Sequence, residues 1–292
     1  MRNIQAIFGH IFILAMKNIL IPTDFSQNAR NALRYALAYF PETAVNFYIL
    51  HIEHFENNNL EGQENFTLTL SPKTLSETQK SLQKEIDFCK KKSTNPLHNF
   101  IPLISDKSLV KAIRNCVKEN EIDYIVIGTR GASERKCKNI GSVSYEIISK
   151  VKCPTIVVPK KAIYKNFKNI ALPTDYNHWD KNKMYINLYE TLFLKKAKLH
   201  ILQIQNKNQS LTNIQENSKS FLTDLIKKIN YSLYSIPNHK IEKKLQTYID
   251  KVDINMIVIV GRNVNYVHRL LFQPKSEDIP YRLNTPFLIL HD

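Results

Sequence analysis

Glycine is scarce in this chain, and several common ligand-binding signatures are missing with it. The 292 residues include only six glycines, four cysteines and one tryptophan. Neither the phosphate-binding loop G-x4-G-K-[ST] nor the dinucleotide fingerprint G-x-G-x-x-G occurs, which excludes the two commonest nucleotide loops. The cysteines show neither C-x-x-C nor zinc-finger spacing, so we expect free thiols rather than a cysteine-bound metal.

Long apolar runs are missing too. No apolar segment reaches the ~18–20 residues of a membrane-spanning helix, and the apolar stretch 4–15 lacks a small-residue cleavage site. We therefore expect a cytoplasmic protein in which residues 1–15 form a disordered or loosely packed N-terminal extension. Basic residues exceed acidic ones by 15, but the longest basic run is Lys90–Lys92. Because this charge is spread over both halves, we expect a solvated surface rather than a nucleic-acid site.

The few glycines gather in one place. Gly128, Gly131 and Gly141 lie between the strand-like apolar run 122–127 and a helical apolar pattern. Glycine permits sharp bends and close approach of the backbone, and a helix start presents unpaired N–H groups to an anion. The segment therefore predicts a phosphate-binding connection between a strand and a helix. A simple tight turn is the alternative that this pattern alone leaves open.

Strand-like segments alternate with helical ones along the first half of the chain. Examples are the strand pattern Val45–Ile52 and the helical pattern Leu75–Cys89 that follows it. This alternation predicts an α/β fold with a parallel sheet covered on both faces, and right-handed crossovers make it doubly wound. Pro102 predicts an edge position for the third strand, 98–104, because proline cannot donate to a central ladder.

The pattern then restarts, which indicates an internal repeat. KNIALPTDY from Lys168 repeats KNILIPTDF from Lys17 at an offset of 151, and INMIVIV from Ile254 repeats IDYIVIG from Ile122 at an offset of 132. We therefore expect two tandem domains, the second 19 residues shorter between its first and fourth strands. The expected divisions are 1–15 for the extension, 16–160 for domain 1 and 161–292 for domain 2, with the shortfall around 237–253.

The offset of 132 allows the two glycine loops to be compared residue by residue. In domain 2, Gly128, Gly131, Gly141 and Ser142 are replaced by Val260, Asn263, Gln273 and Pro274. Valine adds a branched side chain and proline removes a backbone donor, so we expect no equivalent nucleotide site in domain 2.

The fifth strands of the two domains predict how they assemble. Thr155–Val158 and Phe287–Leu290 are short, apolar and equivalent in the repeat. Exposed apolar edges are rarely left unpaired. We expect these strands to pair antiparallel within one chain, with Val157 near Ile289, which forms an intramolecular pseudo-dimer. A homodimer through another surface stays open.

The spacing G-x2-G-x9-G-S, complete from Gly128 to Ser142, resembles the ATP-binding signature of the universal stress protein family. This resemblance implies ATP or a related adenine nucleotide across the carboxyl ends of the first and fourth strands, with Mg²⁺ held by the phosphates where it is present. Asp24 would accept from the ribose or base, and Ile52 would pair with adenine through its backbone. The residues that the resemblance assigns to the nucleotide are Pro22, Thr23, Asp24, Ile52, Ile127, Gly128, Gly131, Gly141, Ser142, Val143 and Ser144. Arg130 is added as a neighbour of the phosphates on the basis of its charge alone.

Three classes of function follow from these patterns. The first, which we favour, is a nucleotide-responsive stress or regulatory protein with a protein partner that the sequence does not name. The second is a slow ATPase or phosphotransferase, although no catalytic residues are assigned. The third is a basic polyanion binder. We expect no metal site at His51, Glu53 and His54, because alternation along a strand leaves too few ligands on one face.

Overall fold

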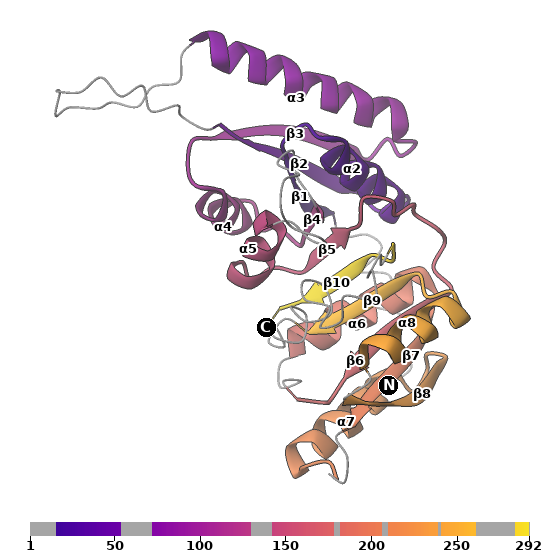
Figure 1. The fold of residues 1–292 in the computed structure, drawn as a ribbon. Coiled ribbons are helices and arrows are strands. Elements are labelled where there is room, and N and C mark those ends of the chain that lie inside the picture. Colours follow the sequence, from indigo (N-terminus) through magenta and orange to yellow (C-terminus); the bar gives the residue numbers. More distant parts are fainter. Residues whose placement is uncertain are drawn as a thin grey trace, which may run out of the picture.

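The computed structural model describes residues 16–53, 72–129, 142–177, 182–205, 210–238, 241–260 and 284–291. The N-terminal half contains β1 (Lys17–Thr23), α2 (Gln27–Tyr39), β2 (Val45–Ile52), α3 (Pro72–Lys92), β3 (His98–Ser105), α4 (Leu109–Glu119), β4 (Tyr124–Gly128), α5 (Ser142–Lys150) and β5 (Thr155–Val158). The C-terminal half contains β6 (Asn169–Thr174), α6 (Asn182–Lys195), β7 (Lys198–Gln205), α7 (Asn213–Ile226), β8 (Tyr231–Pro237), α8 (Ile241–Val252), β9 (Met256–Val260) and β10 (Phe287–Leu290). The expected α/β alternation is confirmed (Figure 1).

All ten described strands belong to one sheet, in the order β3-β2-β1-β4-β5-β10-β9-β6-β7-β8. Every neighbouring pair is parallel except β5 and β10, which run antiparallel. Each half therefore has the same strand order, and the two halves meet at their fifth strands. As predicted from Pro102, β3 is an edge strand.

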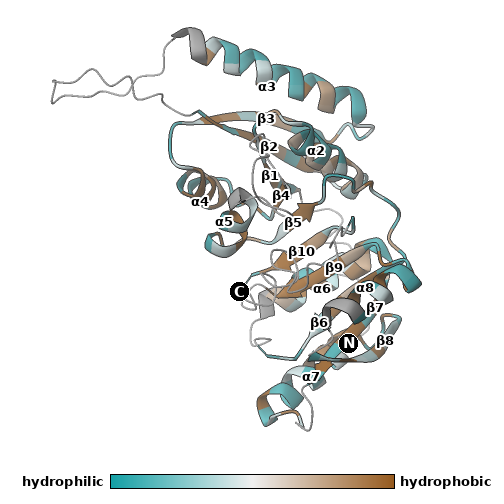
Figure 2. Cartoon of the chain, viewed as in Figure 1, coloured by the Kyte–Doolittle hydropathy of each residue, from teal (hydrophilic) through white to brown (hydrophobic). Residues whose placement is uncertain are grey.

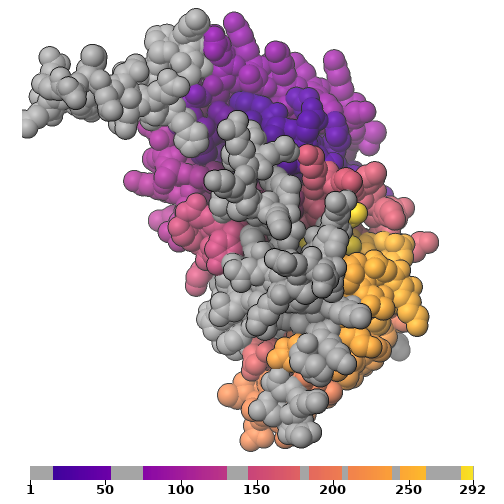
Figure 3. Space-filling model, in the orientation of Figure 1, coloured from indigo at the N-terminus to yellow at the C-terminus, as the bar shows by residue number. Residues whose placement is uncertain are grey.

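The strands are largely hydrophobic (Figure 2), and apolar side chains are buried on both faces of the sheet, as expected for parallel strands. One core is formed by α2, α3, α6 and α7 against the sheet, and the other by α4, α5 and α8. Each core includes residues from both halves, because the sheet passes through the junction without interruption. The two halves follow one another along the sheet, and they occupy opposite ends of the molecule (Figure 3). None of the described helices is long and apolar enough to cross a membrane.

The fifth-strand junction forms as predicted, but its register differs from the expectation. Ile156 lies opposite Leu288, and Val157 lies opposite Phe287 rather than Ile289. Ile156 and Leu288 are equivalent in the repeat, and both side chains are fully buried. An antiparallel pair related by a twofold axis sets equivalent residues opposite each other only on the axis. The Ile156–Leu288 pair therefore marks the local pseudo-twofold axis.

The position of the shortened segment also differs from the expectation. The third strand and the following helix are both present in the C-terminal half as β8 and α8. The shortening lies instead before β8. Nineteen residues separate β2 from α3, but only seven separate β7 from α7. In addition, α3 has 21 residues and α7 only 14. The placement around 237–253 was therefore wrong.

A buried carboxylate joins the two halves beside the junction. Glu190 on α6 pairs with Lys17 Nζ of β1 at 2.8 Å. It also accepts from the Tyr124 hydroxyl of β4 at 3.3 Å. Burial is the main reason that the pKa of Tyr124 is raised well above its usual value, so this hydroxyl remains a donor. Because both partners come from the other half, the Glu190 contacts help to fix the relative position of the halves.

Lys195, in the last turn of α6, is inserted among aromatic rings of the N-terminal half and the linker. Its Nζ donates to the backbone carbonyl of Tyr39 and lies 3.9 Å from the centre of the Tyr39 ring. The rings of Tyr164 and Phe167 lie 5.6 and 5.7 Å away. Burial lowers the pKa of Lys195 to about 7, although nearby Glu42 acts in the opposite direction.

The depressed pKa of Lys195 predicts a distinct pH dependence of stability. Between pH 7 and 10 the unfolded chain binds a proton at this lysine that the folded chain does not, so the free energy of unfolding should rise with pH. Lys195→Met should remove this rise and should be more stable than the natural protein at pH 6. Urea unfolding at pH 6, 7.5 and 9 measures both effects, with Lys196→Met, at an exposed position, as the control. A variant that is less stable at every pH would contradict the prediction.

Candidate functional site

The strand order reverses at the carboxyl edge of the N-terminal half, and we call the position beside the ends of β1 and β4 the crevice. From β1 the chain crosses to β2 on one side, whereas β4 pairs with β1 on the other side. Open α/β sheets bind ligands where the strand order reverses in this way. Thr23 at the end of β1 and Gly128 at the end of β4 flank this point, and Ile52 ends β2 next to it. The crevice therefore brings together three of the residues predicted to contact the nucleotide.

The first wall of the crevice is a tight turn after β1. Thr23 Oγ1 accepts from the Phe25 backbone N–H at 3.0 Å, and Asp24 Oδ1 accepts from the Ser26 N–H at 3.0 Å. Ser26 Oγ then caps α2 by accepting from Ala29 N–H at 3.2 Å. The Asp24 side chain is exposed. Asp24 therefore has a structural role in the turn, which the sequence pattern did not separate from ligand binding.

The same turn recurs in the C-terminal half. Thr174 Oγ1 accepts from Tyr176 N–H at 2.9 Å, and Asp175 Oδ1 accepts from Asn177 N–H at 3.0 Å. Phe25 and Tyr176 both have φ of 61°, a left-handed conformation that is uncommon for aromatic residues. The Thr-Asp pair thus specifies the turn in both halves. The presence of the Thr-Asp pair alone therefore does not indicate a nucleotide-binding site.

Sequence reasoning missed an aromatic pair at the rim of the crevice. The rings of Phe25 and His51 stack with centroids 4.4 Å apart. His51 Nδ1 donates to the Thr23 carbonyl at 2.8 Å, which leaves Nε2 toward Glu53, 3.8 Å away. Thr78 of α3 donates to the same Glu53 oxygen at 2.5 Å. The unusual φ of Phe25 aims its ring at His51, and no sequence pattern that we used signals this.

The second wall is the end of β4, where glycine is required by packing. A Cβ atom at Gly128 would lie 2.9 Å from the backbone oxygen of Asn28, closer than real contacts allow. Ser144, in the first turn of α5, is buried and donates its hydroxyl to the Gly128 carbonyl at 2.7 Å. Gly128 therefore permits α2 and β4 to approach each other, and Ser144 joins β4 to α5.

The corresponding position in the C-terminal half contains an apolar side chain. Val260 ends β9, is 5% exposed and belongs to the apolar core around α6 and α7. The Asn28 backbone lies where a Gly128 side chain would be, whereas the equivalent position in β9 holds a buried valine side chain. The two halves therefore differ at the end of the fourth strand.

The structure describes only some of the remaining residues that were predicted to contact the nucleotide. Pro22 lies within β1, Ile127 within β4, and both Ser142 and Val143 in the first turn of α5. The predicted phosphate contacts Arg130, Gly131 and Gly141 lie outside the described residues, as does His54. Among the described residues, no group of three metal-ligating side chains lies close enough to hold a metal ion.

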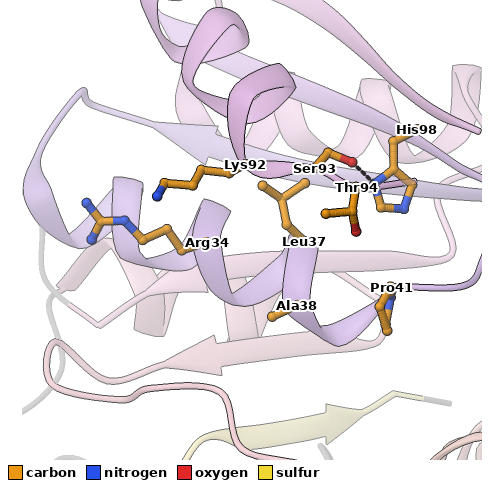
Figure 4. Close-up of a pocket in the computed structure, with 8 residues that line it drawn as sticks. All are labelled: Arg34, Leu37, Ala38, Pro41, Lys92, Ser93, Thr94 and His98. Carbon is orange, nitrogen blue, oxygen red and sulfur yellow. Dashed lines mark hydrogen bonds between the residues drawn. The ribbon is translucent and has the colours of Figure 1, made fainter. Parts of the chain in front are cut away.

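A cavity of about 340 Å³ lies elsewhere, between the C-terminal ends of α2 and α3 (Figure 4). It is lined by Arg34, Leu37, Ala38, Pro41, Lys92, Ser93, Thr94 and His98. His98 Nε2 donates to the Phe40 carbonyl at 3.0 Å, while Nδ1 lies 2.7 Å from Ser93 Oγ. Burial lowers the pKa of His98. Because His98 begins β3, this cavity is at the amino edge of the sheet, away from the crevice.

Comparison with known proteins agrees with this architecture. The universal stress protein family model matches residues 16–159. A universal stress protein from Methanocaldococcus jannaschii is 25% identical over 157 residues, which cover 50% of this chain and 96% of that protein. A universal stress protein structure from Archaeoglobus fulgidus superposes with a TM-score of 0.64 at 14% identity, over 94% of this chain and 98% of the other. A functionally unknown protein from Pseudomonas aeruginosa gives a TM-score of 0.52 at 13% identity, over 96% of this chain and 94% of the other.

Proposed function

Because residues 16–159 belong to the universal stress protein family, we propose that this chain binds one adenine nucleotide in its N-terminal half. The nucleotide is ATP or a close relative, and it lies across the carboxyl ends of β1 and β4. The chain divides into domains at 16–160 and 161–292, and nucleotide occupancy of the first alters how the protein meets a partner in the cytoplasm. Any Mg²⁺ is held by the phosphates.

One observation carries this proposal: the two halves share a fold but differ at the crevice. Both keep the Thr-Asp turn. Only the N-terminal half has glycine at the end of its fourth strand, where the counterpart is buried Val260. The glycine and serine spacing from Gly128 to Ser142 is likewise intact only there. Packing of α2 against β4 also requires Gly128, so the complete glycine and serine spacing, rather than this glycine alone, supports a ligand in one half.

The Thr-Asp turns offer a matched pair of variants. In Asp24→Asn the amide oxygen can still accept the hydrogen bond of the turn. The variant loses the negative charge of the carboxylate, which would strengthen a hydrogen bond from a ribose or base. We expect ATP affinity to fall about tenfold or more, the scale of a charge-assisted hydrogen bond. Asp175→Asn makes the same change in the other half and should leave affinity unchanged.

Titration calorimetry with ATP measures both effects and gives the stoichiometry. The proposal requires about one nucleotide per chain, with Asp24→Asn as the sensitive variant. Two equivalent sites, or equal losses from Asp24→Asn and Asp175→Asn, would refute the assignment to one half. No measurable binding of ATP, ADP or AMP would refute the function itself.

A further inference from the structure

The linker between the halves covers one face of α2. Asn31 Nδ2 of α2 donates to the carbonyls of Pro159 and Ala162, at 3.2 and 3.0 Å. Further along the helix, the Tyr164 ring packs edge-on against Tyr35, with centroids 5.5 Å apart. The linker therefore runs along α2 from its first turns toward its end before the chain continues into β6.

The linker buries the face of α2 that carries Tyr35 and Tyr39. Phe167, just before β6, packs edge-on against Tyr39 with centroids 5.6 Å apart. Tyr35 and Tyr39 are each only 3% exposed, and Ala162 of the linker is also 3% exposed. The segment that leads into β6 is therefore part of the core packing of the N-terminal half.

The pseudo-twofold axis relates α2 to α6, but the equivalent faces of these two helices are not covered equally. The offset of 151 that relates β1 to β6 equates Tyr35 with Ile186 and Tyr39 with Glu190. Glu190 is buried, but Ile186 is 47% exposed, against 3% for its counterpart. Phe193, two turns further along α6, is 39% exposed. Among the described residues, α6 thus has an apolar face without the cover that α2 receives.

The same offset identifies a segment that would supply this cover. It equates buried Ala162 and partly buried Tyr164 of the linker with Ile11 and Ile13, and Phe167 with Met16. The chain is already beside α6 when it begins β1, since Lys17 Nζ contacts Glu190 at 2.8 Å. Residues 3–16 contain no acidic or basic side chain apart from one histidine, as an apolar contact surface requires.

We propose that residues 8–15 bind along α6 over Ile186, as the linker binds along α2. The N-terminal extension is then packed as part of the C-terminal half. This proposal differs from the loose extension that we expected from the sequence alone. The interaction surface consists of Ile186 and Phe193 on α6, and its occupant is the preceding segment of the same chain. This assignment does not depend on the nucleotide site.

Proximity tests the proposal directly in the full chain. With Cys137→Ser as background, because the other three cysteines are buried, Ile13→Cys and Ile186→Cys are combined and treated with a short bismaleimide. Crosslinking within the chain should be at least about tenfold faster than for Ile13→Cys with Phe221→Cys, an exposed position on α7. Equal rates would overturn the proposal. Crosslinks only between chains would show that a second copy covers α6, which also overturns it.

Removal of the segment provides an independent readout. A chain that begins at Met16 should lose about 3 °C or more in melting temperature. Amide exchange in α6 should become at least about fivefold faster, whereas exchange in α4 should not change. Ile186→Lys in the full chain should reproduce the faster exchange. Unchanged exchange in α6 after removal of residues 1–15 would overturn the proposal.

Discussion

Replacing Gly128 by valine, the residue found at the equivalent position of β9, should abolish nucleotide binding. A Cβ atom there would lie 2.9 Å from the Asn28 backbone oxygen, so α2 would have to move away from β4. Overpacking of this kind costs about 1–3 kcal/mol. A folded but less stable protein that no longer binds ATP is the expected result. Circular dichroism and titration calorimetry on the same sample separate folding from binding.

The reciprocal change serves as the control for Gly128→Val. Val260→Gly removes a buried side chain and should lower the free energy of unfolding by about 2 kcal/mol or more, from lost burial and added backbone freedom. It should leave ATP affinity unchanged, because we place no ligand beside β9. Full ATP affinity in folded Gly128→Val would show that the ligand does not approach β4.

Leu288→Asp should prevent the stable folding of the whole chain. Leu288 is fully buried opposite Ile156 at the junction of the two halves. Loss of a buried leucine costs about 2–5 kcal/mol, and an unpaired buried charge adds about 3–5 kcal/mol. The total approaches the ~5–15 kcal/mol by which folded proteins are usually stable. Urea unfolding and sedimentation should show loss of the cooperative transition or aggregation.

The matched control is an aspartate where leucine is exposed. Leu97 is 57% exposed, and Leu97→Asp should change stability by no more than about 0.5 kcal/mol. If Leu288→Asp unfolds only the C-terminal half and leaves a cooperative transition from the other, the halves do not form one unit. That outcome would contradict our expectation that the continuous sheet makes the two halves fold as one unit.

Sequence patterns predicted the elements and the topology because most strands are apolar and the repeat keeps a constant offset at each of its ends. They misplaced the shortening because β8 does not resemble a buried strand. It is an edge strand whose residues Tyr231, Leu233 and Tyr234 are exposed, so hydrophobic periodicity is weak there. The antiparallel junction was predicted, but its register was not, since repeat offsets equate residues without showing which of them face each other.

The candidate site was predictable only in part, for a related reason. Glycine spacing led to Gly128, yet the structural cause of that glycine is the backbone of Asn28, about 100 residues away in sequence. The Thr-Asp pair was assigned to ligand binding, whereas hydrogen bonds show that it also forms the turn in both halves. The stacking of Phe25 on His51 depends on one unusual φ angle. Such effects arise from tertiary contacts that local patterns do not contain.

The pairing of β5 with β10 has a consequence for synthesis on the ribosome. Phe287 follows Val158 by 129 residues. At ~5–20 residues per second, the nascent N-terminal half waits roughly 6–26 s before its partner strand is made. Throughout that interval the uncharged strand TIVV presents an open edge that another nascent chain could join. Neighbouring ribosomes on one message would hold such edges close together, so chaperone protection of newly made N-terminal halves is expected to matter more than protection of the finished protein.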